Sequence, residues 1–532
     1  MSWLSKARAA LHGPASRRAA DGEAAELARY ADKASELERR LREQFAVPSA
    51  PGTVPLGRAR EWNWEARMPA SKLAAHALIV GPSGSGKSYF TALLLQGLLA
   101  SGVRSFTVLD PKAETVELMK AVVAGAAARL APERRRQLLG RVVLFDLFGT
   151  RALPRLNVLA PVQGLDEESH AFQIALLFSD MSADVGVRQE AILYLVVLCL
   201  LKAGLPITVL PTALEAPLLL ERLALRAGPA DLFRTTASRL KKEGRERILG
   251  LMSRAERVLR LRATRLALGA DGCIDFGEVL DLVSLVNLAP PQGAADISRV
   301  LSGLLWMGIS HAIRRRANGA ARCHLVIDEA PTFLAAGGAR MADSLEDLFR
   351  LARSKGVNVT ALTQDLSSIA KVSSSLPETL RTNMHLVALF RCLADAQWDF
   401  VLPVTGRRPK AERAPWEEAR GGYLERSAEV QLLRGELQRL PDRECYLADR
   451  RTGLPGVRLR TADLALAATR AEIASLEEAA HRHPMLASVP ELERAAEATA
   501  RRVAALLDVG DHQLAESDRA PVRRARGKLD IG

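Results

Sequence analysis

The chain has 532 residues, of which 48% are apolar, so it can bury a large core and is not a predominantly disordered protein. It has room for two to four domains, or for one large domain with additions. Its 74 basic and 61 acidic residues give a formal charge of +13. This charge favours an anionic partner (nucleic acid, an anionic membrane surface or a nucleotide), although a basic composition without such a partner also explains it.

Targeting and membrane signals are weak along the chain. Residues 1–18 are basic but lack the apolar centre of a signal peptide. The most apolar stretch, Ala191–Leu201, is shorter than the roughly 20 residues that span a bilayer, so we expect a buried helix there. The five cysteines are far apart and form no CxxC pair, which favours a reducing compartment over a metal site. We expect a cytoplasmic protein that reaches the inner membrane, if at all, through partners.

The N-terminal part is predicted to form a helix and then a linker. Over Asp21–Phe45, apolar residues recur at alternating steps of three and four, on one helix face. They are Leu27, Tyr30, Ala34, Leu37 and Leu41. This face suits either a short coiled coil with a partner or packing on its own domain, and the shortness of the pattern favours packing. Ala46–Gly57 is rich in Pro and Gly, which predicts a linker.

From Ala77 onward, short apolar runs alternate with helical stretches. The runs are Ala77–Val80, Phe106–Leu109, Val142–Phe145, Leu282–Leu288, His324–Ile327, Val357–Leu362 and His385–Phe390. This alternation predicts an α/β fold, in which a mainly parallel sheet carries helices on both faces.

The segment Gly81-Pro-Ser-Gly-Ser-Gly-Lys-Ser88 matches G-x-x-x-x-G-K-[ST] between a predicted strand and a predicted helix, which indicates a P-loop NTPase (RecA-like) fold that binds ATP. Its glycines let the backbone N–H groups point at phosphates, and the helix N-terminus adds its dipole. Lys87 should reach the β- and γ-phosphates, and the Ser88 hydroxyl should bind Mg²⁺. The expected nucleotide-binding residues are Gly81, Pro82, Ser83, Gly84, Ser85, Gly86, Lys87, Ser88 and Tyr89.

Between residues 167 and 270 the sequence is typical of helices alone, which predicts an all-α insertion domain. Eleven basic residues occur from Arg234 to Arg265, against three acidic ones. A solvated helix face and a surface that follows a phosphate backbone explain this run equally well, since few aromatic residues are interleaved for base stacking.

Two adjacent carboxylates are predicted at the end of a buried strand. His324–Ile327 is followed by Asp328 and Glu329, at the strand edge where open α/β sheets bind ligands. Asp328 would hold Mg²⁺ through its water shell, and Glu329 would polarise the attacking water. Asp110 and Asp146 also end predicted strands, but no Glu follows either of them. The pair therefore indicates hydrolysis rather than a kinase.

The strand Val357–Leu362 ends in Thr363 and Gln364. Beside a γ-phosphate, Gln364 would orient water and sense hydrolysis. By itself this is an ordinary polar strand end, and the other two motifs favour the sensor role.

These motifs, in this order, resemble the FtsK–HerA superfamily of ring-forming DNA pumps, and most of all the conjugative coupling proteins of type IV secretion. The resemblance extends from about Pro55 to Ala394, and a weaker similarity continues to Arg460. Beyond the P-loop, the segments that carry it are Pro55-Leu-Gly57, Val108–Lys112 (like "DPKGE", with Ala113 in place of Gly), Phe145-Asp146 with Leu156–Leu159, and Leu351–Gly356 with Gln364.

The resemblance implies a homo-hexamer with ATP between subunits and an arginine supplied by the neighbour. Arg353, eleven residues before Gln364, matches best, and Arg381 and Arg391 are alternatives. It also implies a motor that moves along single- or double-stranded DNA. Coupling proteins usually carry N-terminal transmembrane helices, whereas we expect none here, so membrane, relaxase or nuclease partners are implied. Two alternatives remain: a secretion ATPase acting on proteins, or an ATP-dependent switch that recruits a nuclease or relaxase, as in phage defence.

We therefore expect five segments. They are an N-terminal helical extension and linker (1–50), the first part of the ATPase domain (51–166), the all-α insertion (167–270), the second part of the ATPase domain (271–460), and C-terminal helices with a basic tail (461–532).

Overall fold

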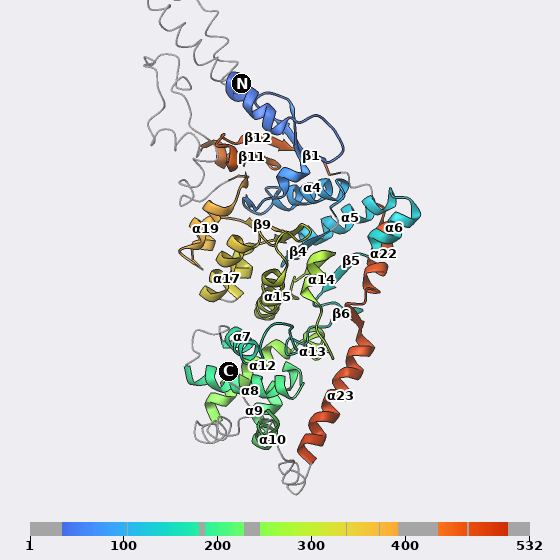
Figure 1. Cartoon of the computed structure of the whole chain (residues 1–532), viewed down its shortest axis with the longest axis vertical. Coiled ribbons are helices and arrows are strands. Elements are labelled where there is room, and N and C mark those ends of the chain that lie inside the picture. The colour runs from blue at the N-terminus through green and yellow to red at the C-terminus, as the bar shows by residue number, and fades with distance from the viewer. Residues whose placement is uncertain are drawn as a thin grey trace, which may run out of the picture. The chain divides into compact units, whose positions relative to one another are not determined.

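Two compact units make up the chain in the computed structural model. The model describes residues 35–103, 105–179, 187–227, 245–336, 338–371, 373–391, 435–464 and 468–508. The first unit comprises residues 1–154, 180–183 and 274–487, and the second comprises 155–179, 184–273 and 488–532. Figure 1 shows the elements of both units by label.

An eleven-stranded sheet forms the centre of the first unit, in the order β2-β1-β12-β11-β10-β3-β9-β8-β4-β7-β5. Its strands are β1 (Thr53–Ala59), β2 (Glu65–Pro69), β3 (Ala77–Val80), β4 (Phe106–Asp110), β5 (Val142–Asp146), β7 (Val283–Asn287), β8 (Cys323–Ile327), β9 (Val357–Thr363), β10 (Leu386–Leu389), β11 (Glu444–Asp449) and β12 (Val457–Thr461). The seven strands from β10 to β5 pair in parallel, and they are the seven predicted from sequence. The predicted parallel α/β sheet is thus confirmed.

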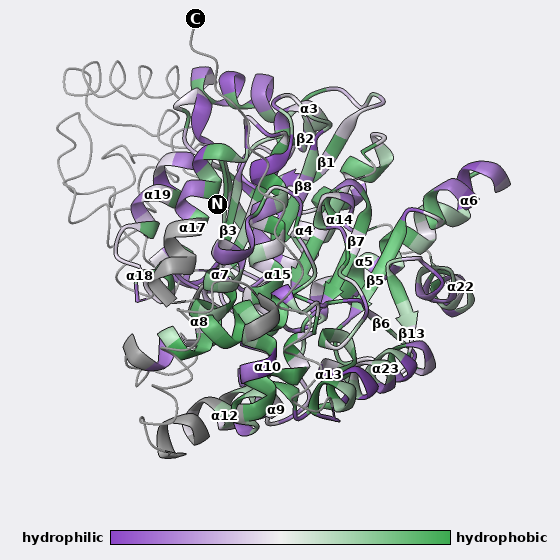
Figure 2. Ribbon diagram, turned by 60° about the horizontal axis from the view of Figure 1, so that its bottom comes forward, coloured by the Kyte–Doolittle hydropathy of each residue, from purple (hydrophilic) through white to green (hydrophobic). Residues whose placement is uncertain are grey.

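Two groups of helices pack on this sheet. The first contains α4 (Lys87–Ala100), α5 (Glu114–Ala128), α6 (Pro132–Leu139) and α22 (Arg470–His481). The second contains α14 (Phe276–Asp281), α15 (Ala295–Arg315), α16 (Ala330–Ala336), α17 (Gly338–Leu351), α18 (Leu366–Ala370) and α19 (Leu376–Asn383). Figure 1 shows α4 and α15 on opposite sides of the strands. With both faces covered, parallel strands are largely apolar, as the green β5 and β7 in Figure 2 illustrate.

The predicted linker Ala46–Gly57 is wrong in its second half, because Thr53–Gly57 belongs to β1. β1 pairs antiparallel with β12 and β2, next to a register shift between Pro55 and Gly57. Gly57 has φ 152°, and a β-carbon there would lie 2.1 Å from the Arg460 carbonyl oxygen. Pro and Gly therefore mark a bulged strand of the sheet rather than a connection without structure.

The described part of the predicted N-terminal helix, residues 35–45, is helical. Leu41 and Phe45 are fully buried in the core that also holds Val54. This favours packing of the helix on its own domain over a coiled coil. Residues 21–34 lie outside the described residues.

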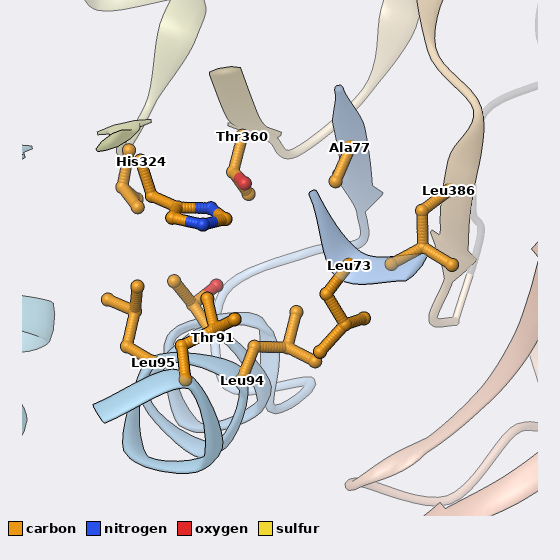
Figure 3. A pocket seen from close by; sticks show the side chains of 10 residues that line it. Leu73, Ala77, Thr91, Leu94, Leu95, His324, Thr360 and Leu386 are labelled. Atoms are coloured by element: carbon orange, nitrogen blue, oxygen red, sulfur yellow. The ribbon is translucent and has the colours of Figure 1, made fainter. Parts of the chain in front are cut away.

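Helix α4, which follows the P-loop, lies flat on the sheet. Figure 3 shows Leu94 and Leu95 of α4 opposite His324 of β8 and Thr360 of β9, around a cavity of about 20 Å³. Gly97 lets α4 approach β1, since a β-carbon there would lie 2.2 Å from Val54 Cγ1. Such close packing fixes the helix, and with it the loop at its N-terminus.

Helices form the second unit, as predicted for its central part. They are α7 (Glu167–Ser179), α8 (Val187–Lys202), α9 (Leu210–Glu215), α10 (Pro217–Ala227), α12 (Arg245–Leu259), α13 (Arg262–Leu268) and α23 (Val489–Asp508). The apolar stretch Ala191–Leu201 lies within α8 and is mostly buried, as expected. Among the described residues, none of the helices is both long enough and apolar enough to cross a membrane.

Candidate active site

Four adjacent strands deliver polar residues to one edge of the sheet. The order β3-β9-β8-β4 places the P-loop, Gln364, the Asp328-Glu329 pair and Asp110 side by side at the carboxyl ends of these strands. The register aligns these ends, because Val80 pairs with Thr363 and Leu109 pairs with Ile327. Motifs far apart in the sequence therefore meet at one place, the usual ligand-binding edge of such sheets.

The P-loop has the backbone curvature that a phosphate cradle needs. Gly84 and Gly86 have φ of 77° and 106°, which glycine adopts without strain. The Ser85 hydroxyl donates to the Pro82 carbonyl oxygen (2.8 Å), and the Gly81 N–H donates to Thr363 (3.1 Å). The loop is thus tied to itself and to β9, and it leads directly into α4 at Lys87.

The Lys87 ammonium is largely buried and donates to the Pro82 carbonyl oxygen at 3.0 Å. Burial lowers the pKa of Lys87, and the charges of Glu329 and Asp328 act in the opposite direction. The three predicted residues are therefore close enough to interact electrostatically, and a phosphate would satisfy this buried cation.

Asp328 is buried and fully held by neighbours. Its Oδ2 accepts a hydrogen bond from the Thr115 hydroxyl (2.7 Å), and its Oδ1 accepts one from the Glu329 N–H (2.9 Å). Burial, followed by the charge of Asp110, raises the pKa of Asp328 to about 6, and the bond from Thr115 lowers it. A carboxylate destabilised in this way favours a cation beside it.

Glu329 is held in an uncommon backbone conformation, with φ 51°. Its Oε1 accepts from Lys112 Nζ at 2.5 Å and from Gln364 Nε2 at 3.1 Å. Gln364, predicted as the sensor, therefore contacts the predicted base directly. Within the described residues, the side-chain bonds of Glu329 therefore go to Oε1.

Three residues of this site were not predicted from the sequence, namely Asp110, Lys112 and Thr115. Asp110 is buried, and its oxygens accept from the N–H groups of Lys112 (2.8 Å) and Val116 (3.0 Å). These bonds shape the turn after β4 that presents Lys112 to Glu329. Ala113 in this turn has φ 65°, in the region that favours glycine, at the position where the related motif "DPKGE" has Gly. The resemblance of Val108–Lys112 to that motif was the signal in the sequence that could have assigned Asp110 and Lys112 to the site.

The proposed arginine finger is not in the same site. Arg353 is exposed in the turn before β9, at the amino ends of the parallel strands. A strand of seven residues spans about 20 Å, which separates Arg353 from Gln364 at the other end of β9. Burial is the main cause of the lowered pKa of His76 and of His385, and the charge of Arg353 adds to it in both.

The two alternative arginines make other ion pairs. Arg381 pairs with Glu378 within α19. Arg391 lies just after β10 and pairs with Asp442 at 2.7 Å. Of these residues, Arg391 lies at the same sheet edge as the P-loop.

The donors at this edge fit a hard cation such as Mg²⁺. Ser88, in the first turn of α4, offers a hydroxyl, and Asp328 a carboxylate, both oxygen ligands of the kind Mg²⁺ prefers. No cluster of three or more His, Cys, Asp or Glu able to hold a metal occurs among the described residues. Mg²⁺ keeps several waters and phosphate oxygens, so two protein donors suffice.

Comparison with known proteins shows which families and solved structures this chain is similar to. Residues 54–160 match the family described as "Helicase HerA, central domain", so this segment is similar to the central domain of HerA. The plasmid coupling protein TrwB with the GTP analogue GDPNP has 16% identity and TM-score 0.50, covering 82% of this chain and 94% of TrwB. TrwB with ADP and Mg²⁺ has 17% identity and TM-score 0.50, with the same coverage.

VirB4 of Thermoanaerobacter pseudethanolicus has 14% identity and TM-score 0.49, covering 79% of this chain and 99% of VirB4. No curated protein sequence matches the chain. At these identities, the similarity to TrwB establishes the fold. The predicted P-loop NTPase fold and its resemblance to FtsK–HerA and coupling proteins are thus confirmed.

Proposed function

We propose that the chain is an ATPase that couples hydrolysis at this site to translocation of DNA, as a ring of six copies. The observation that carries the proposal is the convergence of the P-loop, Asp328-Glu329 and Gln364 on three adjacent strands. These are the groups required to bind a nucleoside triphosphate, hold Mg²⁺ and activate water.

ATP would bind with its phosphates on the P-loop N–H groups and on Lys87. Mg²⁺ would be held by Ser88 and, through water, by Asp328, and when bound it neutralises phosphate charge. TrwB, which shares the fold, was solved with ADP and Mg²⁺, in agreement with this assignment.

Glu329 would accept the proton of the attacking water through Oε2, while Lys112 and Gln364 hold Oε1. Fixing one oxygen orients the carboxylate, so that only small rearrangements are needed at the moment of reaction. Gln364 also joins Glu329 to β9, so a change at the γ-phosphate can be passed along that strand.

Arg353 is exposed at the far edge of the sheet and out of reach of the nucleotide on its own P-loop, so a role as arginine finger requires a nucleotide held by a neighbouring subunit. We propose that Arg353 acts in trans, where such a finger contributes about 10³–10⁵ in rate. The hexamer itself is inferred from resemblance to the FtsK–HerA superfamily.

The proposal of DNA as the substrate rests on the formal charge of +13 and on the basic run of the helical unit. Part of that run, residues 234–244, lies outside the described residues. In the described part, Arg257, Arg260, Arg262 and Arg265 are exposed; Arg262 also pairs with Glu493, and Arg265 donates to the Leu259 carbonyl oxygen. We assign the exposed arginines of this run to DNA.

The test is phosphate release with and without DNA. Wild type should hydrolyse ATP faster with DNA, Lys87→Ala should not bind ATP, and Glu329→Gln should bind without turnover. Charge reversal in the helical unit should remove the stimulation and keep the basal rate; its targets are Arg254, Arg257 and Arg260. The matched control reverses three arginines of α6, namely Arg134, Arg135 and Arg136, and should keep both rates.

Two outcomes would point to other functions. Equal stimulation in both triple variants would contradict DNA contact by this run, and the absence of stimulation by DNA in wild type would favour a secretion ATPase acting on proteins. DNA-stimulated hydrolysis without displacement of a triplex-forming strand would favour a switch that recruits a nuclease or relaxase.

A further inference from the structure

Arg443, a residue outside the sequence motifs, contacts the P-loop from the start of β11. Its backbone N–H donates to the Ser85 carbonyl oxygen at 2.9 Å. Its α-carbon would lie 3.2 Å from a β-carbon at Gly86, the residue just before Lys87. Arg443 therefore packs against the turn of the P-loop that places Lys87 and the first N–H groups of α4.

The side chain of Arg443 continues this contact along α4. Its guanidinium carbon lies 4.3 Å from the centre of the Tyr89 ring. Nη2 donates to the carbonyl oxygens of Thr461 (3.1 Å) and Ala462 (3.0 Å) and to Asp463 Oδ1 (2.7 Å). The planar guanidinium is thus fixed by acceptors at its edge and by an aromatic ring on its face, an arrangement that lysine cannot reproduce.

Tyr89 is also held from a second direction. The Leu464 N–H donates to the Tyr89 hydroxyl at 2.7 Å, and the Thr461 N–H donates to the Arg443 carbonyl oxygen at 2.9 Å. Residues 443 and 461–464 thereby form one connected support behind the P-loop and the first turn of α4.

The backbone of Arg443 is strained. Its φ is 65°, in the region that favours glycine. A non-glycine residue stays in this conformation when the surrounding contacts require it, and such residues gather at functional sites. Here the requirement comes from the bond to Ser85 together with the stacking on Tyr89.

We propose that Arg443 is a positioning residue for the phosphate-binding loop. It acts through Ser85, Gly86 and Tyr89, and holds them in the conformation that binds a nucleoside triphosphate. The inference rests on the proposed function, since it assumes that the P-loop binds ATP. It assigns no contact with the reacting atoms to Arg443.

The test compares the Kd of a fluorescent ATP analogue with Mg²⁺, and the melting temperature without nucleotide, across variants of the full chain. Arg443→Gly accepts the positive φ and removes only the side chain, so the Kd should rise about fivefold to tenfold. Arg443→Lys keeps the charge and should give an intermediate Kd. Arg439→Gly, the same change at an exposed residue in the turn before β11, should bind like wild type.

A wild-type Kd in Arg443→Gly overturns the inference, including the case in which its melting temperature falls, because the residue would then be merely structural. If Arg443→Gly does not fold, the Kd of Arg443→Lys is used instead, and a wild-type Kd in Arg443→Lys also overturns the inference. Failure of the proposed function looks different: wild type would not bind the analogue, or Lys87→Ala would bind it equally well, and both proposals would fall together.

Discussion

At the scale of single residues, the site combines groups that are unfavourable by themselves. Asp328 and Lys87 are buried charges, and Glu329 and Arg443 have positive φ. Each is stabilised by a partner that the sequence does not place beside it, such as Thr115 for Asp328 and Lys112 for Glu329. Removing a partner should therefore change activity and stability in specific ways.

We expect Lys112→Met to lower kcat about tenfold and to leave KM within about threefold of wild type, because it removes a hydrogen bond that orients Glu329. Steady-state ATPase kinetics measure both constants. Lys72→Met, at a partly exposed lysine of α3 (Ala70–Leu73), is the control and should match wild type. A rise in kcat would contradict the orienting role and indicate that Lys112 restrains Glu329.

Asp328→Asn should make the protein more stable at pH 7.5 while abolishing hydrolysis. Burial raises the pKa of Asp328 to about 6, so its ionised form destabilises the folded state at this pH, by up to about 3 kcal/mol. The Thr115 hydroxyl can accept from the new amide. Urea unfolding with EDTA measures the difference, and a less stable variant would show that the carboxylate is not a source of strain.

At the scale of elements, the position of the P-loop depends on how α4 packs on the sheet, and in particular on strand β1 of that sheet. Seven strands were predictable because buried parallel strands are continuous apolar runs. β1 was not, because its Pro and Gly residues suggest a linker when neighbours are ignored. Two predictions concern this packing and the β3–β9 pair beside it.

Gly97→Ala should destabilise the first unit by about 1–3 kcal/mol, because its methyl group would overlap Val54 of β1. Val54→Ala removes the overlapping atoms, so the double variant should be more stable than the sum of the single effects predicts. A double-mutant cycle from urea unfolding measures this coupling. Additive effects would mean that α4 shifts away from β1 instead.

His76 should make the sheet sensitive to acid. Burial, followed by the charge of His385, lowers the pKa of His76 to about 4, and its Nδ1 accepts from the Val359 N–H of β9 at 2.9 Å. Below about pH 6.5 the unfolded chain takes up a proton, whereas the folded chain does so only near pH 4. The stabilisation, complete above pH 6.5, is therefore lost as the pH falls through this window, by about 3 kcal/mol.

His76→Asn keeps an acceptor for Val359 and cannot be protonated. Its free energy of unfolding should fall less between pH 7.5 and pH 4.5 than that of wild type, as measured by urea unfolding at each pH. Parallel pH profiles of the two proteins would show that His76 does not titrate on unfolding.

At the scale of the whole molecule, the helical unit is assembled from distant parts of the chain. α23 comes from the C-terminal end, and its Leu492 and Leu506 are buried. Arg222 of α10 donates to the Leu506 carbonyl oxygen, and Arg502 donates to Ala203 and Gly204 at the end of α8. α23 therefore stabilises this unit rather than the sheet.

A chain ending at Ala487 should lose hydrogen-exchange protection in α8, α10 and α13 and keep it in β3, β8 and β9, because α23 packs on α10 and α13 of its own unit. Hydrogen exchange monitored by mass spectrometry resolves these segments. A chain ending at Asp508 controls for loss of the last residues and should match the full chain. Loss of protection in the strands would contradict this division.

The parallel strands, the P-loop and the Asp328-Glu329 pair could be predicted from local patterns: apolar runs, a glycine-rich turn and acids that follow a strand. The neighbours of each strand could not, and they became known from the folded chain alone. The strand order brings Lys112 and Gln364 onto Glu329, puts Arg443 behind the P-loop and leaves Arg353 at the far edge of the sheet. Strand order depends on packing between segments hundreds of residues apart, which local patterns do not encode.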